Sequence, residues 1–203
     1  MQSALAPSGT LSARKVKTVR PAPLAWRIRN KTRPAYWLGY LFNQAARLFT
    51  RITQIPCMIA ELRGVLINAD GQRIDYGVLG YRQVTTAFVN FVTDQLQTET
   101  SEFGDFKYHD SGEGNTAEDA SDTDIETTDG ESRATGTQTE NAANIYESVG
   151  TISYTTTKAI VEHGLFSQST GTTLMDRTVF STINVGNGDS IEFTYRLTLT
   201  AGS

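Results

Sequence analysis

Two places in the chain set a histidine beside a carboxylate: His109-Asp110 and Glu162-His163. Such pairs can move protons, but catalysis also needs a nucleophile and an orienting group close by in space. The sequence has no nucleophile elbow, phosphate-binding loop, zinc-protease motif or dinucleotide-binding motif. Cys57, the chain's single cysteine, follows a proline in an apolar stretch and is interpreted as a small packing residue. We therefore expect a protein that is not an enzyme.

Carboxylates at close intervals between Asp119 and Asp129 could hold a hard cation. The stretch lacks the glycine that an EF-hand loop needs at its turn, and no helix pair is predicted around it. Two histidines and one cysteine leave little material for a zinc site. We therefore expect no metal site and no cofactor, and we interpret the acidic stretch as a solvated loop.

Charge is segregated along the chain. Residues 1–60 contain no Asp or Glu and hold 10 of the 18 basic residues. Residues 99–149 hold 14 of the 22 acids and only two basic residues. Opposite charge on separate segments predicts separate partners. The basic segment could lie on the acidic surface of the next copy or on a different acidic surface, or it could be a plain basic tail.

Residues 1–35 are expected to form an extended arm that becomes ordered only on a neighbouring surface. Prolines are spaced through it, each favouring an extended predecessor, and no apolar core pattern is present. Cations interleave with aromatic residues there and in the segment that follows. The predicted partner-binding residues are Arg14, Lys15, Lys17, Arg20, Trp26, Arg27, Arg29, Arg33, Tyr36, Trp37, Phe42 and Phe49.

Residues 36–49 are dense in aromatics and predict a helix, because Trp37, Leu41 and Leu48 recur on one helical face. The first interpretation of that face is core or interface packing. The alternative is a helix lying in a membrane surface with arginines on either side. No apolar run is long enough to span a bilayer. Residues 52–67 suit a helix and a strand equally well.

The predicted fold class is mainly β with some α: a C-terminal antiparallel β-sandwich-like domain, preceded by a helix and a long extended N-terminal arm. The proposed division is a basic arm with an aromatic amphipathic segment over 1–60 and a β-rich domain over 61–203. The second part includes a helix at about 80–98 and an acidic loop region at about 110–142. Alternation is clearest near the C-terminus, where Ile191, Phe193 and Tyr195 share one face. Short apolar runs between turns favour a sandwich or small barrel.

Three segments carry a resemblance to a known class: Glu162–Phe166, Leu174–Phe180 and Gly188–Ile191. With Phe106–Gly114 and Glu131–Ile152, they are similar to the C-terminal part of virion proteins of tailed bacteriophages. The resemblance covers about residues 78–203 and implies a structural role, without catalytic or binding residues to transfer. Within that class we favour a capsid decoration (cement) protein, because an arm lying along neighbouring subunits adds contact area that a compact domain lacks.

The resemblance implies a location in the virion, with the major capsid protein and further copies of this chain as partners. A homo-oligomer is expected, and a trimer is suggested by analogy alone. A tail, neck or baseplate component stays open as an alternative. A nucleic-acid-binding protein that uses the basic arm is a further alternative, as is membrane contact through residues 36–49. An Arg-rich, acid-poor N-terminus also fits an organelle transit peptide.

Overall fold

The computed structural model describes residues 19–53, 57–82, 84–96, 106–171 and 173–200. Within these ranges the chain is mainly β with three helices, which confirms the predicted fold class. The helices are α1 (Leu24–Thr32), α2 (Pro34–Thr53) and α3 (Thr86–Gln95). The strands are β1 (Val19–Pro21), β2 (Cys57–Ile67), β3 (Arg73–Arg82), β4 (Tyr108–Gly112), β5 (Ala134–Thr135), β6 (Thr137–Ala142), β7 (Ile145–Ser153), β8 (Lys158–Phe166), β9 (Leu174–Val185) and β10 (Ser190–Thr200).

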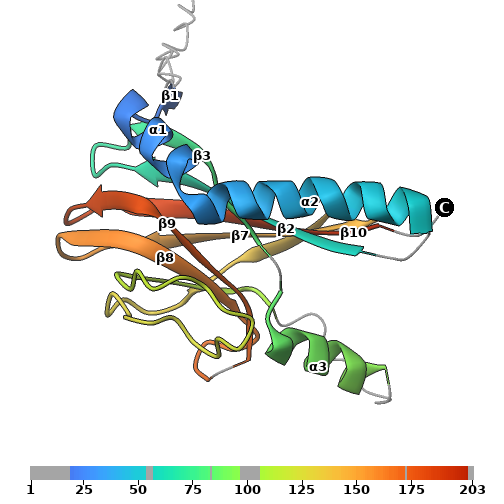
Figure 1. Cartoon of the computed structure of the whole chain (residues 1–203). Helices are drawn as coiled ribbons and strands as arrows, with labels where there is room; N and C mark the ends of the chain where they lie inside the picture. Colours follow the sequence, from blue (N-terminus) through green and yellow to red (C-terminus); the bar gives the residue numbers. More distant parts are fainter. Residues whose placement is uncertain (1–18, 54–56, 83, 97–105, 172, 201–203) are drawn as a thin grey trace, which may run out of the picture.

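The strands form two sheets that face each other. The larger has the order β1-β3-β2-β10-β7-β6 and the smaller has the order β5-β4-β8-β9. Only β1 runs parallel to its neighbour; the other pairs in the described residues are antiparallel. Figure 1 shows α2 along one side of these layers and α3 well away from it.

The core lies between the sheets and follows the alternation read from the sequence. Ile191, Phe193 and Tyr195 of β10 are each fully buried. Ile160 of β8 and Ile183 of β9 meet them from the other sheet. Successive side chains point to opposite faces of a strand, so one face of each strand packs in the core and the other face lies outside it.

Helix α1 closes the gap between the edges of the two sheets. The side-chain amide of Asn30 donates to the carbonyl of Leu79 on β3 at 3.1 Å, and its oxygen accepts from the amide of Ser181 on β9 at 3.0 Å. The indole N–H of Trp26 donates to the carbonyls of Ser181 and Thr182 on β9, both at 2.9 Å. Residues 24–32 are therefore a helix that belongs to the fold, so the prediction of an extended arm is wrong for this segment.

Helix α2 lies against β3 at very short range. A Cβ added at Gly39 would lie 2.3 Å from the carbonyl oxygen of Tyr81. Tyr36 and Tyr40 contact the Tyr81 ring edge-on, with centroids 5.5 and 5.7 Å apart. The small residue thus lets the helix backbone approach the strand, while tyrosines fill the space on either side.

Three further expectations concern where elements begin and end. Of residues 52–67, for which helix and strand stayed open, 57–67 form β2, and the proposed boundary at residue 60 falls inside this strand. The helix expected at about 80–98 is α3, which begins after β3 has ended. Thr85 caps it by accepting a hydrogen bond from the amide of Phe88. The expected acidic loop region is bounded by β4 before it and includes β5 and β6.

Candidate interaction surface

The outward face of α2 is apolar and exposed. Six of its large apolar side chains are between 49% and 63% exposed. They are Trp37, Leu38, Leu41, Phe42, Leu48 and Phe49. The face predicted to pack is therefore not in the core of this chain. The side turned to the sheet carries Tyr36, Gly39 and Asn43 instead. A large apolar surface of this kind marks an interaction site.

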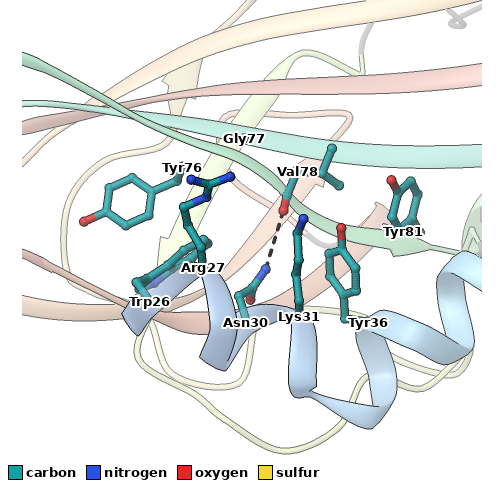
Figure 2. A pocket seen from close by; sticks show the side chains of 9 residues that line it. All are labelled: Trp26, Arg27, Asn30, Lys31, Tyr36, Tyr76, Gly77, Val78 and Tyr81. Atoms are coloured by element: carbon teal, nitrogen blue, oxygen red, sulfur yellow. Dashed lines mark hydrogen bonds between the residues drawn. The ribbon is translucent and has the colours of Figure 1, made fainter. Parts of the chain in front are cut away.

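A separate pocket of about 280 Å³ lies between α1 and β3, and Tyr36 lines it from the sheet-facing side of α2. Figure 2 shows Arg27 and Lys31 of α1 extending along the pocket toward β3. Tyr36, Tyr76 and Tyr81 also line it, and the hydroxyl group of Tyr76 points away from the other two. Two cations near the hydroxyl groups of Tyr36 and Tyr81 form a site suited to a carboxylate or another anionic group.

The three tyrosines of this pocket stay protonated at neutral pH. Burial raises the pKa of Tyr36 and that of Tyr76. Burial is also the main cause that raises the pKa of Tyr81 to about 12, with smaller contributions from Tyr36 and the carboxylate of Glu61. Because the hydroxyl groups of Tyr36 and Tyr81 hydrogen-bond each other, one O–H of this pair remains to donate to an anionic partner.

A groove of about 380 Å³ continues the apolar face of α2 toward the acidic loop. Leu38 and Phe42 line one side, and Glu118 and Asp119 line the other. The side-chain nitrogen of Asn43, which also lines the groove, is buried and has no hydrogen-bond partner among the described residues. The groove thus places apolar side chains of α2 beside carboxylates of the acidic loop.

The acidic loop is held to the body by a buried carboxylate. Glu162 of β8 accepts hydrogen bonds from the amides of Gly114, Glu126 and Thr127 at 2.8 to 2.9 Å. It also pairs with the guanidinium of Arg177 on β9 at 2.8 Å. Glu162 and its sequence neighbours lie within β8, so these contacts tie the loop directly to the smaller sheet.

The two histidines meet in the interior, which the sequence did not reveal. Nδ1 of His109 lies 3.0 Å from Nε2 of His163, and Nε2 of His109 lies 2.8 Å from Oγ of Ser148. This order resembles a catalytic relay, but all three side chains are fully buried. Gly136 and Gly150 pack against the His109 ring so closely that an added Cβ would lie under 3 Å from it. The chain of hydrogen bonds therefore ties the sheets together and leaves no room for a substrate.

The predicted partner-binding residues separate into four groups. Arg14, Lys15 and Lys17 lie outside the described residues. Trp26 is buried and belongs to the core, so it is not an exposed binding residue. Arg20, Arg27, Arg29 and Arg33 lie on β1, on α1 and between the helices, where Arg33 is half-buried and the others are exposed. Tyr36 lines the pocket, and the exposed side chains of α2 are Trp37, Phe42 and Phe49.

The contribution of β3 to the pocket was missed. Tyr76 and Tyr81 approach α1 and α2 only through a contact between distant parts of the chain, and no local pattern signals it. Lys31 could have been predicted as a binding residue, because it lies four residues after Arg27 and therefore on the same helical face.

Within the described residues, no group of three or more His, Cys, Asp or Glu side chains is placed to hold a metal ion. Among the helices of those same ranges, none combines the length and apolar character that crossing a bilayer requires. Comparisons with protein-family models, curated proteins and solved structures find no match to this chain.

Proposed function

We propose that this chain is a structural protein of a tailed-bacteriophage virion, acting as a capsid decoration (cement) protein. The observation that carries the proposal is the exposed surface of α1 and α2. It presents cations and large apolar side chains together, and residues 19–53 contain no acid. Such a surface suits permanent contact with other proteins. The resemblance of residues 78–203 to phage virion proteins is the reason for proposing a virion as the place where this surface acts.

The proposed mechanism is mechanical reinforcement. The paired sheets form a rigid body with a continuous core, so they can transmit load between contact points. The pocket between α1 and β3 binds an anionic group of a neighbouring subunit through Arg27 and Lys31. Residues 1–18 contribute three further cations to the same partner. Contacts at separated points raise the total affinity without any chemical step.

Incorporation into particles tests this proposal. Replacing Arg27 and Lys31 together by Gln is expected to lower the occupancy of the protein in purified particles several-fold. The control is Lys158→Gln, which removes a cation from β8, a strand that does not line the pocket. Full occupancy of the double variant would contradict the role of the pocket. Equal loss with the control would show a general effect of charge.

A nucleic-acid-binding role is the second candidate, because Arg27, Arg29 and Lys31 are exposed on a single short helix. That role predicts DNA binding whose affinity falls steeply with salt, with a slope set by the number of neutralised phosphates. A tail, neck or baseplate position would use the same surfaces at a lower copy number. Absence of DNA binding at low salt removes the nucleic-acid candidate, and the copy number per particle separates the other two.

A further inference from the structure

The outward face of α2 repeats every seven residues. The pair Leu41-Phe42 recurs as Leu48-Phe49, and Leu38 is followed seven positions later by Ala45. All these side chains are exposed. A seven-residue apolar repeat keeps one stripe facing a partner helix along its whole length. These side chains, together with Trp37, are called the α2 stripe, and they have the spacing of a contact between two helices.

The opposite face of the same helix is already occupied. Gly39 touches the backbone of Tyr81, and the rings of Tyr36 and Tyr40 pack against Tyr81 from either side. Asn43 is buried between these contacts. The exposed stripe is thus a second face, and the helix would not need it to stay on the sheet.

The size of the stripe matches a stable interface between two copies. Six large side chains, each about half exposed, offer on the order of 600 Å² per copy, since large apolar side chains bury roughly 150–250 Å². Two copies would together bury about 1,200 Å², the lower bound for a specific interface. The groove lined by Leu38 and Phe42 adds further apolar area beside the helix.

Two other occupants fit less well. A helix that lies in a membrane surface carries its cations on the face opposite the apolar one, whereas that face of α2 packs on β3. Glu118 and Asp119 also line the groove beside the stripe and would repel anionic headgroups. The chain's own residues 1–18 hold few large apolar side chains with which to cover six.

The charge pattern of α2 also suits a second copy. Residues 34–49 carry Arg47 as their only charged residue. Arg47 lines a pocket with Glu61 and Tyr81, on the side of the helix that faces the large sheet. The outward face therefore carries no charge, and the same uncharged surface can face its own copy across a two-fold axis.

We infer that α2 pairs with α2 of a second copy across a two-fold axis, through its seven-residue apolar stripe. A two-fold contact of this kind closes on itself, so this surface alone gives a dimer rather than the trimer suggested by analogy. The inference concerns the α2 stripe only, and it would stand if the proposed place in a virion failed.

Sedimentation velocity on the purified full chain tests the inference. The wild type is expected to sediment as a dimer, and the double variant Leu41→Gln/Leu48→Gln as a monomer with an unchanged circular dichroism spectrum. The control is Leu96→Gln, which alters a leucine that is 79% exposed at the end of α3. A monomeric wild type, or equal dissociation by the control, would overturn the inference.

Disulfide cross-linking tests the geometry in a Cys57→Ser background. Ala45→Cys is expected to give a covalent dimer on mild oxidation, because Ala45 is exposed within the stripe. Arg47→Cys is expected to give none, because Arg47 lies on the side of α2 that faces the large sheet. An Arg47→Cys dimer without an Ala45→Cys dimer would overturn pairing through the stripe. Vesicle binding by a monomeric wild type would assign the stripe to a membrane and overturn the inference as a whole.

Discussion

Glu162 and Arg177 form the buried ion pair on which the acidic loop depends. The guanidinium is 3% exposed and the carboxylate 0%. Replacing Arg177 by Met leaves the carboxylate buried without its partner, which costs about 3–5 kcal/mol of unfolding free energy. Urea denaturation followed by circular dichroism measures this loss.

The matched control is Arg73→Met, which breaks the Arg73–Glu192 pair at the surface. Both of its side chains are about one-third exposed, so the expected loss is about 0–1 kcal/mol. Similar losses for the two variants would contradict the structural role given to Glu162.

The histidine pair makes a prediction about pH. Burial lowers the pKa of His109 from 6.5 to about 3 and lowers that of His163 as well, helped by His109. Below pH 6.5 the unfolded chain therefore binds more protons than the folded one. The stability from this pair is complete above that pH and is lost as the pH falls toward 3. For His109 the loss at pH 5 is about 2 kcal/mol.

Carboxyl groups near the pair act in the opposite direction. Burial raises the pKa of Asp110 and of Asp129, so the folded state takes up their protons first as the pH falls. Nitrogen NMR of the histidine rings separates the two effects. Both rings are expected to stay neutral from pH 7 to pH 5 while the protein stays folded. A ring that titrates near pH 6.5 in folded protein would contradict the buried pair.

At the scale of elements, α2 shows how a residue with no side chain fixes the position of a helix. Gly39→Ala is expected to cost about 1–3 kcal/mol, because the new methyl group would lie 2.3 Å from the Tyr81 carbonyl oxygen. The usual gain of helix propensity on replacing Gly by Ala, about 1 kcal/mol, would not offset this. Thermal unfolding shows directly whether the Gly39→Ala variant is less or more stable than the wild type.

Gly186→Ala provides the comparison. The nearest heavy atom to a Cβ there is Oδ2 of Asp189 at 3.6 Å, an ordinary contact. Its expected effect is within about 0.5 kcal/mol. If Gly39→Ala instead raised the melting temperature, the close approach of α2 to β3 would be wrong.

The elements also show which parts of the fold the sequence can predict. Alternation sufficed for β10, where Ile191 and Phe193 point into the core as expected. It failed for α1, a helix of nine residues that depends on contacts of Trp26 and Asn30 with distant strands. For α2 the helix was predicted, but its packed face uses residues such as Gly39 that an apolar pattern ranks low.

The same limits hold for the interaction surface. The cations of α1 were found because charge segregation is visible in the sequence, and the aromatics of α2 because they are dense and recur on one helical face. The tyrosines of β3 and the burial of Trp26 were not, because both arise from pairing between segments far apart in the chain. Sequence patterns thus locate surfaces that one continuous segment forms, and miss surfaces that distant segments form together in the folded chain.

At the scale of the whole molecule, the N-terminal region divides into two parts with different roles. Deleting residues 1–35 is expected to lower stability by at least about 3–5 kcal/mol, because it removes the buried Trp26 with the rest of α1. Deleting residues 1–18 is expected to leave the melting temperature unchanged and to weaken incorporation into particles. Equal destabilisation by the two deletions would contradict the assignment of α1 to the fold.

Quantitative mass spectrometry of purified particles tests the proposed place of this chain in a virion shell, by counting it relative to the major capsid protein. A structural component of the shell is expected at a ratio near one to one, or one to a small whole number. A few copies per particle would move the protein to the neck or tail. Absence from the particles would contradict the proposal.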